Sequence, residues 1–159
     1  MRLVPFIAIP LLAGCAQLGL PQPFSRPPAE TPPQVAPEVA AVVAAPRPPG
    51  AARTAEEFDT TTPEQRAAAT AVDADAGPLL GTTVASLGDP ADAGLWIETP
   101  LASAPGPGWL VYPETGRSAI VELRPIDGPS SAGSRVSLAA MRLLEAPLTG
   151  LPTLQVYAQ

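Results

Sequence analysis

The sequence predicts a mainly β protein whose small folded domain, residues 79–159, follows a long proline-rich segment. Three observations support this prediction. Short apolar runs separated by Gly and Pro begin near residue 79, as in all-β domains. A serine-capped helical pattern occurs only at 137–144 within that domain. Residues 21–50 are mostly Pro, Ala, Val and Glu, a composition too poor in large apolar side chains to form a core.

The N-terminus has the layout of a secretory signal, which assigns residues 1–14 to a cleaved signal peptide. A positive charge at Arg2 precedes an apolar run over 3–12, and small residues then lead to Cys15. That run has roughly half of the ~20 residues that a membrane-spanning helix needs. Pro5 and Pro10 would also break such a helix, so we do not expect a membrane span.

Residues 12–15, Leu-Ala-Gly-Cys, resemble the bacterial lipobox, in which the cysteine receives a diacylglycerol and often a further acyl chain such as palmitate. Cys15 is the only cysteine, so it cannot form an internal disulfide. Two or more acyl chains give stable membrane attachment. We therefore expect a lipoprotein anchored through Cys15 on the periplasmic side of the cell envelope. Ala16 follows where aspartate would favour the inner membrane, so the outer membrane is preferred.

Residues 15–52 are predicted to be the lipidated N-terminus and a disordered tether, partly in the polyproline-II conformation. A short helix and a linker are expected over 53–78. Thr62 is a capping residue, Pro63 occupies the first helical position, and Gln65 is placed to close a capping box.

Within the domain, short apolar runs predict five strands, at 82–87, 95–98, 109–112, 117–123 and 154–157. The third and fourth flank the turn sequence Pro-Glu-Thr-Gly at 113–116, which predicts a hairpin. Alternation along the fourth strand places one set of side chains inward and the other outward. The inward set is Ala119, Val121 and Leu123, and the outward set is Ser118, Ile120 and Glu122.

Three segments resemble the rare-lipoprotein-A family: Gly-Arg-Ser-Ala-Ile-Val-Glu-Leu at 116–123, Gly-Pro at 128–129, and Gly-Ser-Arg-Val-Ser-Leu at 133–138. The resemblance covers residues 95–157. It implies a six-stranded, double-psi-like β-barrel with one short helix. Its members are envelope lipoproteins that bind or cleave peptidoglycan glycan strands. Arg117 and Arg135 fall on matched positions, and we expect them to pair with Asp127 and hold a loop, rather than to bind an anionic ligand.

The catalytic residues of that family do not carry over. Cleaving members have a histidine before the hairpin, and this chain has no histidine. Asp127 is one residue short of the family spacing, and Ser137 replaces an acidic residue. The resemblance therefore implies a binding protein without glycan chemistry.

Composition limits the other possibilities. A chain without histidine has no Ser-His or Cys-His pair. Two aspartate pairs lack the spacing of a calcium loop, so we expect loop charges and neither a metal nor another cofactor; they are Asp73 with Asp75 and Asp89 with Asp92. A net charge of −6 disfavours nucleic acid as a partner. Trp96 and Trp109 are expected in the core, with sugar stacking as the alternative.

The sequence thus favours an anchored, non-catalytic envelope lipoprotein that binds peptidoglycan or another envelope protein. One alternative is a degenerate, lytic-transglycosylase-like enzyme that uses a carboxylate pair; the acidic residues available are Glu98, Glu114, Glu122 and Asp127. Another is an assembly factor that docks a protein through a strand edge. Short lipoproteins of this pattern also resemble proteins named as sugar-acid (galactarate) dehydratases, but the residues present supply no support for that chemistry.

Lipidation at Cys15 is the first testable expectation. Cells fed an alkyne fatty acid should label the wild-type protein, whereas Cys15→Ser should carry no label because no other thiol is present. Gel fluorescence after coupling a dye to the alkyne measures the difference. Equal labelling of both proteins would contradict the lipoprotein assignment.

Overall fold

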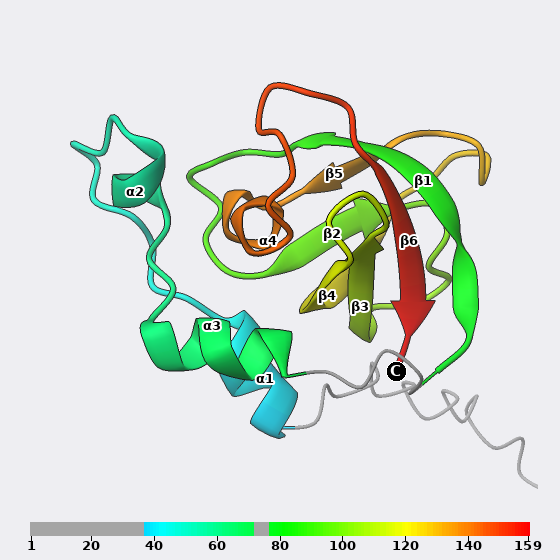
Figure 1. The fold of residues 1–159 in the computed structure, drawn as a ribbon, viewed down its shortest axis with the longest axis horizontal. Coiled ribbons are helices and arrows are strands. Elements are labelled where there is room, and N and C mark those ends of the chain that lie inside the picture. The colour runs from blue at the N-terminus through cyan, green and yellow to red at the C-terminus, as the bar shows by residue number, and fades with distance from the viewer. Residues whose placement is uncertain (1–36, 72–76) are drawn as a thin grey trace, which may run out of the picture. The chain divides into compact units, whose positions relative to one another are not determined.

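A computed structural model describes residues 37–71 and 77–159 of the chain (Figure 1). The expected signal peptide, Cys15 and the tether up to residue 36 lie outside the described residues. Asp73 and Asp75 also lie outside them.

The domain is a closed six-stranded β-barrel, which confirms the predicted fold class. Around the barrel the strands follow the order β1-β5-β2-β4-β3-β6. The five predicted strands are present: four have longer bounds, the second is shifted by one residue to 96–99, and β5 is an additional short one. The strands are β1 (Leu79–Leu87), β2 (Trp96–Thr99), β3 (Gly106–Tyr112), β4 (Arg117–Pro125), β5 (Ser134–Val136) and β6 (Thr153–Ala158).

The strand pairing has two equivalent halves. The β1–β5 and β2–β4 pairs are parallel, and the other four pairs around the barrel are antiparallel. If β1 is exchanged with β4, β2 with β5 and β3 with β6, the six pairs and their parallel or antiparallel directions stay the same. Every pair also joins a strand of one half to a strand of the other. Neither half can therefore form its own sheet, and the barrel must close as a unit.

The predicted β3–β4 hairpin is confirmed. The two strands pair from Gly106 opposite Leu123 to Tyr112 opposite Arg117. Gly116 has a φ of 68°, and its amide donates to the Tyr112 carbonyl at 2.9 Å, which closes the turn. The predicted alternation along β4 is also confirmed. Its inward set is buried, at 0% exposure for Ala119 and Val121 and 3% for Leu123.

Helix α4 (Leu138–Leu143) is the helix predicted near the C-terminus, and it packs into the same core. The Ser137 hydroxyl accepts hydrogen bonds from the amides of Ala140 at 3.3 Å and Trp96 at 3.1 Å. One side chain therefore caps the helix and fastens it to the start of β2. Ala140 and Met141 of this helix are fully buried in the core.

The expected helix within 53–78 is present as two separate helices, α2 (Ala55–Phe58) and α3 (Pro63–Thr70). Both begin with a capping box, and the one at Thr62 and Gln65 is the box that the sequence predicts. The break between them has a local cause. Asp59 accepts hydrogen bonds from the amide and hydroxyl of Thr61, which favours a turn over a continuous helix.

Residues 37–52 differ from the expected disordered tether. They contain α1 (Pro37–Val43), and the chain then runs along the barrel. The Val43 carbonyl accepts a hydrogen bond from the Leu95 amide at 2.8 Å, and Val43 is 8% exposed. Gly94 permits this approach, because a Cβ there would lie 2.5 Å from that carbonyl oxygen. Composition alone did not reveal that the barrel offers a surface on which small side chains can pack.

Residues 37–71 form what we call the N-terminal clasp, which is fastened to the domain at a second point. Arg142 of α4 forms ion pairs with Asp59 at 3.2 Å and Glu56 at 3.5 Å, and donates to the Ala55 carbonyl at 3.2 Å. The Asp59 side chain is only 4% exposed. Removing one partner from a buried pair leaves an uncompensated charge, so this contact holds the clasp in place.

A matched pair of substitutions tests the barrel. Val121→Asp places an unpaired charge in a fully buried site and should cost several kcal/mol, enough to unfold a domain with about 5 kcal/mol of stability. Val84→Asp makes the same change on the outer face of β1, where the side chain is 48% exposed, and should melt near the wild-type temperature. Thermal unfolding followed by circular dichroism distinguishes them. Equal melting temperatures would contradict the assignment of the Val121 side chain to the barrel interior.

Candidate binding groove

A groove of about 540 Å³ lies on the outside of the barrel, beside β1 and the start of β5. Val84, Ile126 and Leu151 form its aliphatic wall, and Ser86 and Arg135 contribute polar side chains; Gly133 and Ser134, whose hydroxyl faces the barrel interior, complete the lining. Leu151 is 70% exposed and Val84 is 48% exposed. Large apolar side chains exposed together around a hollow are typical of binding surfaces.

Backbone contacts place these side chains together. Val84 points outward because its neighbours Thr83 and Ala85 point into the barrel, at 5% and 0% exposure. The Ala85 amide donates to the Pro152 carbonyl at 2.9 Å, which brings Leu151 beside β1. On the other side, the segment before β5 passes close to β1, since a Cβ on Gly133 would lie 3.1 Å from the Val84 carbonyl oxygen.

A chain of buried hydroxyl groups joins three strands beneath the groove. The Ser134 hydroxyl of β5 bonds to the Thr83 hydroxyl of β1 at 2.8 Å and donates to the Thr99 hydroxyl of β2 at 2.9 Å. Thr99 also accepts from the Leu101 amide at 3.2 Å. Exposure is 5% or less at all three hydroxyl-bearing residues. These hydrogen bonds offset the cost of burying polar groups and fix the position of β5.

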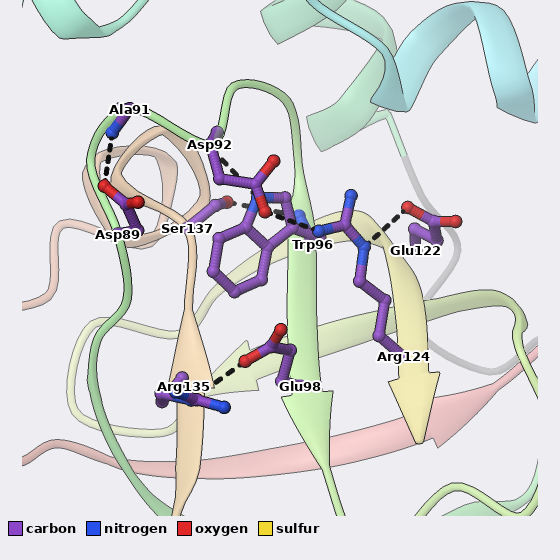
Figure 2. A network of polar contacts seen from close by, with 9 residues as sticks. All are labelled: Asp89, Ala91, Asp92, Trp96, Glu98, Glu122, Arg124, Arg135 and Ser137. Carbon is purple, nitrogen blue, oxygen red and sulfur yellow. Dashed lines mark hydrogen bonds and ion pairs between the residues drawn. The ribbon is translucent and has the colours of Figure 1, made fainter. Parts of the chain in front are cut away.

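Arg135 is the only charged side chain that lines the groove in the described part of the chain. It stands opposite Glu98 in the antiparallel β2–β5 pair, and its Nε contacts Glu98 Oε2 at 2.8 Å (Figure 2). Its side chain is 59% exposed. Within residues 37–71 and 77–159, no hydrogen bond or ion pair engages its two terminal nitrogens. The ion pair therefore orients a guanidinium group whose outer edge remains available.

A second polar network covers the outer face of β2 and β4 (Figure 2). Arg124 forms ion pairs with Glu122 at 2.9 Å and Asp92 at 2.7 Å, and its guanidinium lies 4.9 Å from the ring centroid of Trp96. Burial acts to lower the pKa of Arg124, but the hydrogen bonds to Glu122 and Asp92 outweigh it and raise that pKa. Trp96 donates from Nε1 to the Asp92 carbonyl at 3.0 Å. The network thus holds the loop before β2 against the barrel.

The structure pairs the predicted arginines with partners other than Asp127. Arg117 contacts Glu145 at 2.6 Å, and Arg135 contacts Glu98. Strand register explains the second pairing, because Glu98 lies directly opposite Arg135. Asp127 is exposed in the loop between β4 and β5, next to Ile126 of the groove. The expectation that Asp127 holds this loop through either arginine is therefore wrong.

The three barrel glutamates considered for catalysis have structural partners. Glu98 and Glu122 are in ion pairs with arginines. Glu114 accepts a hydrogen bond from the Tyr112 hydroxyl, which raises the pKa of that tyrosine. Asp89 accepts from the Ala91 amide at 2.8 Å and so stabilises its own turn. These contacts assign the carboxylates to holding the structure together.

Both tryptophans are buried, as expected, but they lie on the outer faces of their strands. Trp96 is 2% exposed beneath Arg124 and the loop before β2, and Trp109 is 1% exposed. Trp109 stacks on Tyr157 of the paired strand β6, with ring centroids 5.6 Å apart and planes 9° from parallel. Neither indole presents a free face to a sugar.

Within the described part of the chain, no group of three or more metal-ligating side chains comes together. Among residues 37–71 and 77–159, no helix has the length and apolar character needed to cross a membrane. Comparison with protein-family models, curated proteins and solved structures finds no significant match. The sequence analysis named Arg135, which lines the groove, but it did not predict the groove itself. Val84, Ile126 and Leu151 belong to three segments that only the fold brings together.

Proposed function

We propose that this protein is a membrane-anchored envelope lipoprotein whose barrel binds peptidoglycan without cleaving it. The observation that carries the proposal is the groove, where exposed Val84 and Leu151 stand beside the oriented guanidinium of Arg135. An aliphatic wall with one directional polar group is the usual composition of a binding site. Glycoside cleavage needs a free acid and a second carboxylate, whereas Glu98 and Glu122 are occupied by arginines.

The sequence resemblance supports the choice of peptidoglycan. The segment that resembles the rare-lipoprotein-A family, residues 95–157, contributes five of the six strands and Arg135. A barrel with two equivalent, interlocked halves is compatible with a double-psi-like arrangement. The lipobox-like sequence at Cys15 and the proline-rich segment after it would place such a module in the periplasm, within reach of the cell wall.

Sedimentation with purified cell-wall sacculi tests this function. The purified full chain should sediment with sacculi and release no soluble muropeptides. Val84→Asp should lose binding because it introduces a charge into the aliphatic wall of the groove. Leu79→Asp is the matched control, since Leu79 lies on the same strand, is 52% exposed and does not line the groove.

The outcomes separate the competing functions. Release of muropeptides would identify a glycan-cleaving enzyme and contradict the proposal. Absence of sedimentation would also contradict it and would favour an envelope protein as the partner. Equal sedimentation of the wild type and both variants would show that binding does not involve the groove.

A further inference from the structure

The groove has the chemistry of a peptide site more than of a sugar site. Sugar rings commonly stack on exposed aromatic faces, which combine an apolar surface with a polar edge. Among the residues that the structure describes, no aromatic side chain lines this groove. Trp96 and Trp109 are both almost fully buried, at 2% and 1% exposure. The groove instead offers branched aliphatic side chains, the Ser86 hydroxyl and one guanidinium.

We propose that the groove recognises the peptide stems of peptidoglycan through a free carboxylate, not the glycan strand. This inference rests on the proposed function and names the part of the polymer that is bound. Peptide stems combine small apolar side chains with carboxylate groups, the two features that the groove complements. A volume of about 540 Å³ is in the usual range for a site that holds a small ligand.

Arg135 supplies the complementary charge. A guanidinium presents N–H donors in a fixed fork that matches the two oxygens of a carboxylate. Glu98 engages Nε, so the terminal nitrogens remain available for a ligand carboxylate. Because the Glu98 contact fixes the orientation of the side chain, less conformational entropy is lost when a ligand binds.

The aliphatic wall stands next to this group. Val84 comes from β1, Ile126 immediately follows β4, and Leu151 comes from the loop before β6. Methyl-bearing side chains of a peptide would cover these exposed surfaces while its carboxylate contacts Arg135. Ser86 lines the same groove and is able to hydrogen-bond a peptide group.

Calorimetric titration of the full chain with defined fragments tests the inference. The probes are free peptide stems released by an amidase, the same stems with their carboxylates amidated, and the denuded glycan left after peptide removal. We expect the free stems to bind and denuded glycan not to bind. Amidation should weaken binding about tenfold or more, because a hydrogen bond to a charged group contributes that much.

Variants of Arg135 distinguish direct contact with the ligand carboxylate from a role in the structure alone. Arg135→Gln should weaken binding of the free stems about tenfold or more, but should not further weaken binding of the amidated stems. Arg117→Gln is the matched control, because Arg117 is also an exposed, ion-paired arginine and lies outside the groove. Melting curves of both variants should match the wild type.

Two results would overturn the inference while leaving the proposed function intact. One is sedimentation with sacculi together with binding of denuded glycan at the affinity of the peptide-bearing polymer. The other is sedimentation of Arg135→Gln at the wild-type level. Failure of the wild type to sediment with sacculi at all would overturn both proposals.

Discussion

The barrel depends on its shortest strand. β5 contains only Ser134–Val136, yet it pairs with both β1 and β2 and so closes the sheet between them. Three residues supply few backbone hydrogen bonds, and the Ser134 hydroxyl adds a side-chain link to Thr83 on one neighbour and Thr99 on the other. These links are buried, where an unpaired hydroxyl would cost free energy. The position of β5 is therefore fixed by hydrogen bonds that form only when the whole barrel is closed.

This arrangement connects the interior to the groove. Ser134 faces inward and its neighbour Arg135 faces outward. The buried hydroxyl bonds that fix Ser134 therefore also fix the position of the Arg135 side chain relative to Val84 on β1. Because all strand pairs join one half of the domain to the other, loss of one pairing affects both halves. We expect a cooperative, slowly folding domain, since most of these pairings join residues distant in sequence. The clasp is attached at Leu95, just before β2, and at Arg142 of α4, separately from the groove.

Local patterns predicted the elements that depend on local chemistry. The turn at Gly116, the serine cap of α4 and the capping box at Thr62 are all set by a few adjacent residues, and all three are present. The alternation around Val121 correctly predicted which face of β4 is buried. β5 was not predicted from its pattern, because three residues are too few to show alternation. Its position was implied only by the resemblance of residues 133–138.

Features that depend on distant partners were harder to predict. Residues 37–43 pack on the barrel where Gly94 allows the Val43 carbonyl to approach closely. No pattern within residues 37–52 contains that information. Arg135 was named from the sequence with Asp127 as its expected partner, but it pairs with Glu98, because strand register and not loop proximity decides the pairing. The most direct test of the central role of β5 is the unfolding free energy of Ser134→Ala, measured in urea beside Ser86→Ala on the outer face of β1. Ser134→Ala should lose about 2–3 kcal/mol because two buried hydroxyl contacts are removed, and Ser86→Ala should lose less than about 1 kcal/mol. Equal losses in the two variants would contradict a barrel closed through β5.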